Sequence, residues 1–151
     1  MSPSMDTCEN ANKEIAGVLR HIRAFLERKT KVVINVQHPL AAFLIRHAGW
    51  LISRFEIRAD GRTGFQRLKG HDYRGLVAGF GECVWSKLPQ QYTLGKLDER
   101  WLSVVWLGKS ERSDEHIVGG VHGINVGRSV RRKIEDKRWS RKAIDCVVGT
   151  P

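Results

Sequence analysis

A carboxylate, an amide and three cations stand near the start of the chain at positions that share one side of a helix. They are Glu9, Asn12, Lys13, Arg20 and Arg23, which fall within about 60° of one direction at roughly 100° per residue. Such a face can offer a metal ligand and several phosphate contacts to one nucleic-acid strand. The same pattern also describes a solvated helix face with i,i+4 ion pairs, and spacing alone favours that simpler interpretation.

A second basic run lies near the C-terminus. Its members are Arg128, Arg131, Arg132, Lys133, Lys137, Arg138, Arg141 and Lys142. A run of this kind can neutralise several phosphates, which makes binding steeply salt dependent. It also fits a nuclear-import signal, or a solvated edge strand whose positive charges prevent aggregation.

The overall charge supports a polyanionic partner. The 151 residues include 26 Lys and Arg against 16 Asp and Glu, for a formal net charge of +10. Nucleic acid is the first expectation, ahead of an anionic membrane, and the alternative is a basic protein that is merely soluble. The chain has three cysteines without CxxC spacing, which predicts neither a disulfide framework nor a zinc knuckle. We expect a nuclear or cytoplasmic protein that is neither secreted nor in a membrane, because the N-terminus lacks an apolar signal segment.

Two helices are expected to position the first set of residues. From 9 to 28, the apolar positions follow helical spacing and oppose the charged face; they are Ile15, Val18, Leu19, Ile22 and Leu26. Residues 29–35 are expected to be a turn and an extended segment. Pro39, at a favoured first position of a helix, begins a second helix over 39–55.

The second half of the chain predicts short strands. Residues 59–79 are Gly-rich and basic, which indicates a linker with one helical turn. Strands are expected over 82–88, 101–108, 116–120 and 124–133, with turns at Pro89, Gly95, Gly119-Gly120 and Gly123. This spacing suggests a small barrel or sandwich, followed by a tail without a clear period. We expect the tryptophans of these runs, Trp85, Trp101 and Trp106, to lie in the core rather than to stack on bases.

Three stretches resemble the integrases of Copia-type and retrovirus-like retrotransposons. The run from Glu9 through Asn12 to Lys13-Glu14-Ile15 is similar to the E-x-x-N, K-E motif on the helix that carries the third acid of the D,D-E triad. The segment 61–70 resembles the family's G-K-T-P-Y-E…G stretch, with Gly64 in place of its Pro. The short motifs FG, KLD, WLG and GRSV, at 80–81, 96–98, 106–108 and 127–130, resemble an SH3-like C-terminal domain in the same order.

The resemblance implies an α+β chain with four parts. Residues 1–58 would be the last two helices of an RNase H-like core, 59–79 a linker, 80–139 an SH3-like β-barrel and 140–151 a tail. Glu9 would be the catalytic, metal-binding carboxylate, with Asn12 and Lys13 along the DNA end. Arg20, Arg23 and the C-terminal cations Arg128, Arg131, Arg132, Lys133 and Arg138 would contact nucleic acid.

The family's chemistry needs residues that this chain lacks. Strand transfer uses two Mg²⁺ or Mn²⁺ ions held by three carboxylates, and no residues upstream of Glu9 can supply the two aspartates that precede it in the family. We therefore expect the chain to be catalytically inactive alone and to bind no metal tightly. The expected partners are element and target DNA, the remainder of the integrase core, and a second copy through exposed apolar helix sides. The main alternative is a non-catalytic, SH3-like module that binds nucleic acid or protein.

Overall fold

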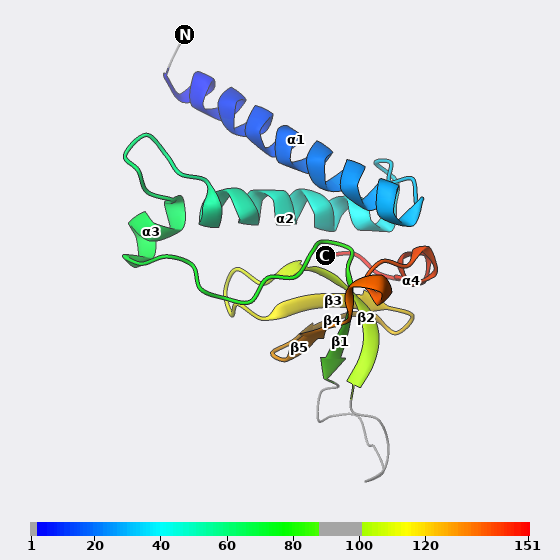
Figure 1. Cartoon of the computed structure of the whole chain (residues 1–151). Helices are drawn as coiled ribbons and strands as arrows, with labels where there is room; N and C mark the ends of the chain where they lie inside the picture. The colour runs from blue at the N-terminus through cyan, green and yellow to red at the C-terminus, as the bar shows by residue number, and fades with distance from the viewer. Residues whose placement is uncertain (1–2, 88–100) are drawn as a thin grey trace.

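Two helices lie over a curled antiparallel sheet. The structure, a computed structural model, describes residues 3–87 and 101–151, with the side chains of the first helix described from Glu9 on. Helix α1 (Pro3–Thr30) packs on helix α2 (Pro39–Phe55), and α2 lies between α1 and the sheet (Figure 1). The α+β class expected from the sequence is confirmed. No helix in these ranges is long and apolar enough to cross a membrane.

Local hydrogen bonds explain where the helices end. Helix α1 is longer than expected and begins at Pro3, so Glu9 lies inside it rather than at its start. At its other end, the Glu27 carboxylate accepts a hydrogen bond from the Ile34 amide at 2.8 Å and holds the extended segment back against the helix. Helix α2 has the expected bounds. His38 caps it, with Nδ1 accepting from the Leu40 amide at 3.1 Å.

The region expected to be a linker contains one short helix, α3 (Gly64–Lys69). Thr63 accepts from the Gln66 amide at 3.0 Å, while the Gln66 side chain accepts from the Thr63 amide at 2.7 Å. This reciprocal capping satisfies two backbone donors that the first turn would leave free. The rest of the segment runs along the lower face of α2 toward the sheet (Figure 1).

The sheet has five described strands: β1 (Cys83–Lys87), β2 (Trp101–Lys109), β3 (His116–Gly120), β4 (Gly123–Gly127) and β5 (Val130–Arg132). Their order is β4-β3-β2-β1-β5, with every pairing antiparallel. The single strand expected over 124–133 is therefore wrong, because the chain turns at 128–129 and its two halves join opposite edges. Since only two residues connect those edges, the sheet must curl strongly, yet it does not close. The turn expected at Gly119-Gly120 is wrong, because both residues belong to β3 and pair with Ile124 and Gly123, and the chain turns at residues 121–122 instead. The turns expected at Pro89 and Gly95 lie outside the described residues.

The main core joins the helices to the sheet. Leu26 of α1, Phe43 and Leu44 of α2, and Val105 and Leu107 of β2 are buried in one cluster. The apolar side of α2 thus covers a sheet formed by this chain. We expected the apolar side of this helix to be exposed because the sheet of an integrase core is missing, and this expectation is wrong. The expected self-association itself stays a prediction.

The final residues also belong to this core. Helix α4 (Arg141–Asp145) follows the 3-10 turn η1 (Glu135–Lys137) and is capped by Ser140, whose hydroxyl accepts from the Ala143 amide at 3.3 Å. Ile144 and Val147 are buried against the sheet and α2. The sequence indicated residues 140–151 only as a tail without a period, but this segment contributes Ile144 and Val147 to the main core, while residues 148–151 are exposed.

Candidate nucleic-acid interface

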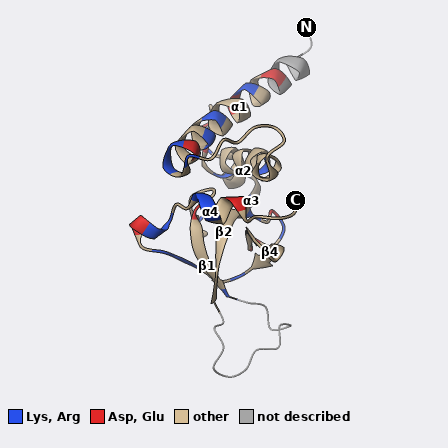
Figure 2. Ribbon diagram, turned by 90° about the vertical axis from the view of Figure 1, so that its right-hand side faces the viewer, with Lys and Arg blue, Asp and Glu red and all other residues tan. Residues whose placement is uncertain are grey.

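The charged face expected on the first helix is present and open to solvent. Glu9, Asn12, Lys13 and Arg20 are exposed on α1, and basic and acidic residues alternate along this helix in Figure 2. Arg20 donates from Nε to the Ala16 carbonyl at 3.2 Å. Within the described residues, Glu9 forms no ion pair. This is the arrangement of a solvated face, and it leaves the carboxylate accessible.

Two other carboxylates of α1 have structural partners. Glu14 pairs with Arg58, with Oε2 and Nη1 3.1 Å apart, which ties α1 to the segment after α2. Glu27 pairs with Arg23 at 3.3 Å besides accepting from Ile34. The Arg23 guanidinium is thus partly committed to the fold, whereas Lys13 and Arg20 have no carboxylate partner among the described residues.

The described side chains near Glu9 do not include the ligands that a pair of metal ions needs. Within residues 9–87 and 101–151, no group of three His, Cys, Asp or Glu side chains is placed to hold a metal ion. A lone exposed carboxylate does not supply the ligand set that a two-metal mechanism needs. The described residues therefore do not fit the Mg²⁺ or Mn²⁺ pair of the resemblance, and no strand-transfer step follows from them.

The sheet offers a different surface, on the face that the helices cover only in part. Alternation places Cys83, Trp85 and Lys87 of β1 on this face, opposite Val105, Ser103 and Trp101 of β2. Cys83 and Val105 are buried, but Trp85 is 41% exposed. On this one face, Cys83 is buried and Trp85 is exposed, because the sheet extends beyond the helices α2 and α4 that cover it (Figure 1).

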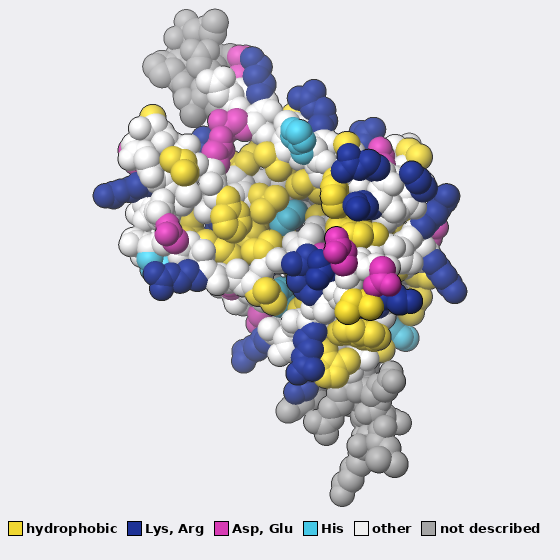
Figure 3. Space-filling view, viewed as in Figure 1, with side chains coloured by type: hydrophobic (Ala, Val, Ile, Leu, Met, Phe, Trp, Pro, Cys, Tyr) yellow, Lys and Arg dark blue, Asp and Glu magenta, His cyan; other side chains and the backbone are white. Residues whose placement is uncertain are grey.

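Cations cover both indoles at this end of the sheet. The Arg131 guanidinium lies 4.5 Å from the centre of the Trp101 ring, and the Lys133 ammonium lies 4.3 Å from that of Trp85. Lys133 also donates to the Ser103 hydroxyl. We call Trp85, Lys87, Trp101, Arg131 and Lys133 the indole-cation surface. Its five residues include three cations and no acidic residue. Figure 3 shows basic side chains beside hydrophobic ones at the lower end of the described part of the molecule.

This surface was missed in the sequence. The expectation that Trp85 lies in the core is wrong, although Trp106 of the next strand is fully buried as expected. Trp101 is half-buried. Alternation was the available signal: Trp85 and Lys87 are two residues apart in β1 and share its face, and Lys133, just after β5, is two residues from Arg131.

The other C-terminal cations expected to contact nucleic acid differ in whether their side chains already have partners within the fold. Arg132 points to the opposite face from Arg131 and donates to the Glu82 carboxylate at 2.9 and 2.7 Å. Arg138 donates from Nε to the Lys133 carbonyl at 2.8 Å, which positions the segment after β5. Arg128 is almost fully exposed, with a carboxylate oxygen of Glu115 3.9 Å away. Among the five C-terminal cations expected to contact nucleic acid, Arg128, Arg131 and Lys133 are therefore more available to an external anion than Arg132 and Arg138.

The buried histidines are held neutral and do not take part in this surface. His47 is enclosed by Trp50, Phe80 and Trp106, and burial lowers its pKa to about 4. His116 accepts from the Trp106 indole nitrogen at 3.0 Å, and burial followed by the Lys109 charge lowers its pKa to about 4. These rings act as uncharged core groups at neutral pH.

Comparison with models of known protein families, with curated proteins and with solved structures found no match for this chain. The likeness to integrases therefore rests on the three motif stretches of the sequence.

Proposed function

We propose that the chain is a nucleic-acid-binding part of a retroelement-type integrase that contacts DNA but does not catalyse strand transfer by itself. The E-x-x-N, K-E helix with its exposed Glu9 and the order of the later motifs support the integrase lineage. In this proposal the curled five-stranded sheet corresponds to the family's SH3-like domain, and α1 and α2 to the end of its RNase H-like core.

The indole-cation surface is the observation that carries the binding proposal. Arg131 and Lys133 are each stacked on an indole and lack a carboxylate partner among the described residues. Stacking holds the long side chains in place, so less side-chain entropy is lost when a phosphate binds. The net charge of +10 supplies the attraction at longer range.

The contacts predict binding with little sequence preference. Cations paired with phosphates position a protein on DNA without reading bases, and the surface offers few donors fixed for base edges. Helix α1, which carries Lys13 and Arg20, and the sheet lie on separate parts of the molecule (Figure 2). We infer that the indole-cation surface makes the main contact and that α1 contributes when the rest of an integrase core is present.

A salt titration with duplex DNA tests this function. Affinity for a 20-base-pair duplex is expected to fall steeply between about 50 and 200 mM salt. The double variant Arg131→Gln/Lys133→Gln should lower the slope of log affinity against log salt by about 2, since each lost phosphate contact removes about one unit. Arg46→Gln, an exposed cation on α2, is the matched control. Salt-independent binding, or no binding at low salt, would refute the proposal.

A further inference from the structure

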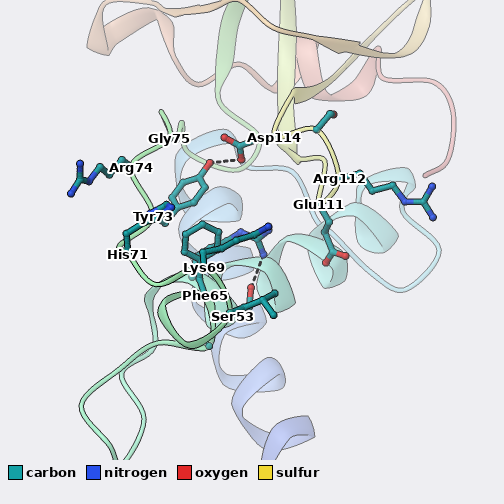
Figure 4. Close-up of a pocket in the computed structure, with 14 residues that line it drawn as sticks. Ser53, Phe65, Lys69, His71, Tyr73, Arg74, Gly75, Glu111, Arg112 and Asp114 are labelled. Carbon is teal, nitrogen blue, oxygen red and sulfur yellow. Dashed lines mark hydrogen bonds between the residues drawn. The ribbon is translucent and has the colours of Figure 1, made fainter.

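A separate hollow of about 700 Å³ opens between α3, the segment that follows it and the loop joining β2 to β3 (Figure 4). This volume lies within the range of small-molecule sites, about 300–1,000 Å³. Ser53 and Arg54, at the end of α2, line it, and Phe65 of α3 and Tyr73 lie near its centre in Figure 4. The hollow has no residue in common with the indole-cation surface.

Arg54, which lines the hollow, is surrounded by aromatic rings instead of carboxylates. Its guanidinium lies 4.8 Å from the centre of a Trp50 ring, 5.6 Å from Phe65 and 5.9 Å from Tyr73. Nη1 donates to the Ser53 hydroxyl at 2.7 Å, whereas Nε is buried without an acceptor. Cation-ring contacts fix the plane of the guanidinium but leave its charge uncompensated, so an anion in the hollow would complete the arrangement.

The charges of the residues that line the hollow also favour an anionic ligand. Besides Arg54, the cations Lys69, Arg74 and Arg112 line it, and none of the four forms an ion pair with a carboxylate of the described residues. In Figure 4, the ends of Arg74 and Arg112 extend outward on opposite sides, where a rotamer change can bring them inward. The hollow therefore has an excess of positive charge.

One of the two lining carboxylates is already neutralised. Asp114 accepts from the buried Lys109 ammonium at 3.2 Å and from the Tyr73 hydroxyl at 2.6 Å. Burial and this hydrogen bond raise the pKa of Tyr73, which keeps the phenol a donor. Glu111 is left as the one lining carboxylate without an ion pair in the described part of the chain.

The rings give the hollow a second kind of contact. Phe65 and Tyr73 meet edge to face, with centroids 5.4 Å apart at 86°. Phe65 also meets the His71 ring at 5.7 Å and 75° and has the Arg54 guanidinium 5.6 Å from its centre. Its side chain is only half-buried, so its accessible part can contact a planar group. A ligand that carries both a planar ring and a phosphate would use the aromatic and the cationic groups together.

We propose that this hollow binds a nucleoside 5′-phosphate unit, with the base against Phe65 and the phosphate near Arg54 and Lys69. The unit can come from a free nucleotide or from the phosphorylated end of a nucleic-acid strand. A neighbouring hollow shares Gly75 and Asp114 with this one and reaches Trp101 and Arg131. A strand on the indole-cation surface could therefore place its end here, but a free nucleotide needs no such route.

Calorimetry with defined probes tests the site. Adenosine 5′-monophosphate is expected to bind about tenfold or more tightly than adenosine, because charge-assisted hydrogen bonds to the phosphate are lost in the nucleoside. Lys69→Gln should weaken binding of the monophosphate several-fold. Phe65→Leu should weaken it about fivefold or more, the scale of a lost base stack. Arg46→Gln, which removes a cation from the exposed side of the same helix as Arg54, should leave it unchanged.

A second arm identifies the source of the phosphate. A ten-nucleotide single strand with a 5′-phosphate is compared with the same strand without it. Preference for the phosphorylated strand, lost in Lys69→Gln, assigns the site to a strand end; binding of the monophosphate without this preference assigns it to a free nucleotide. Equal binding of adenosine and its monophosphate together with no strand preference, or full binding by both Lys69→Gln and Phe65→Leu, overturns the proposal.

The same binding measurements distinguish a failure of this site from a failure of the proposed DNA-binding function. Arg131→Gln/Lys133→Gln should retain the monophosphate affinity while losing duplex affinity, because its substitutions lie outside the hollow. If duplex binding fails in the parent protein but the monophosphate binds, the proposed function alone is refuted. Thermal unfolding of each variant shows whether it is folded. Arg54→Gln should also weaken monophosphate binding, but Arg54 packs among three rings, so this loss supports the site only together with the same loss in Lys69→Gln.

Discussion

The Glu82 carboxylate, which is fully buried, receives two parallel hydrogen bonds from Arg132, a residue 50 positions later. Glu82 precedes β1 and Arg132 ends β5, so the pair fastens the edge strand to the start of the sheet. Glu82 also accepts from the Gly79 amide at 3.2 Å. A cation expected from sequence to contact nucleic acid is thus committed to the fold.

Arg132→Gln should lower the free energy of unfolding by about 2–4 kcal/mol. Loss of the guanidinium leaves a buried carboxylate without its partner, and the half-exposed position of Arg132 keeps the cost below that of a wholly buried pair. Urea unfolding measures the change. The double variant Glu82→Gln/Arg132→Gln should be less destabilised than the sum of the two single variants; simple additivity would contradict a coupled pair.

Gly81→Ala should destabilise the junction between α1 and the sheet by about 1–3 kcal/mol. Gly81 has a φ of +79°, and a Cβ there would approach both terminal methyl groups of the buried Leu26 to 2.7 Å. Gly17→Ala is the matched control, since a Cβ there meets nothing within 4 Å. In a helix interior this control should raise stability by up to about 1 kcal/mol, and a similar loss in both variants would argue against the close contact.

Acid should destabilise the protein partly through His47. Its pKa is about 4 in the folded chain against an ordinary 6.5, so the unfolded chain binds a proton that the folded chain excludes. The stability contribution is complete above pH 6.5 and is lost as the pH falls toward 4, by roughly 3 kcal/mol in all.

Unfolding at pH 7.0, 5.5 and 4.5 tests this contribution. His47→Leu should change stability at pH 7 by less than about 1.5 kcal/mol, because the two side chains have similar volumes. Its stability should then decline less with acid than that of the parent. Carboxylates titrate in both proteins and cancel in the comparison; an identical pH dependence would show that His47 titrates normally.

Glu9→Gln should leave the free energy of unfolding within about 0.5 kcal/mol of the parent, as for exposed sites in general. The side chain is exposed and has no ion pair among the described residues. If Glu9 is the third acid of an integrase, the same change should abolish strand transfer in an enzyme whose upstream core has been restored. A restored enzyme that stays active with this substitution would shift attention to Glu14, although Arg58 already pairs with that carboxylate.

Local sequence signals are sufficient to predict the two long helices and the class of the fold. Helical spacing of apolar residues and the His38-Pro39 start are local signals, and α2 has the bounds they predict. Strand β3 also matches, because His116–Gly120 is an apolar run bounded by turn residues. The open charged face of α1 follows from the same periodicity.

Which charges and aromatic rings reach the surface depends on tertiary packing, and local patterns do not predict it. Trp85 and Trp106 lie in similar apolar strands, but Trp106 faces the buried interior while Trp85 stands beyond the helices under Lys133. Arg131 and Arg132 are neighbours, yet one stacks on Trp101 and the other pairs with buried Glu82. These outcomes depend on strand register, on where the covering helices end and on contacts across 50 residues, none of which a local pattern encodes.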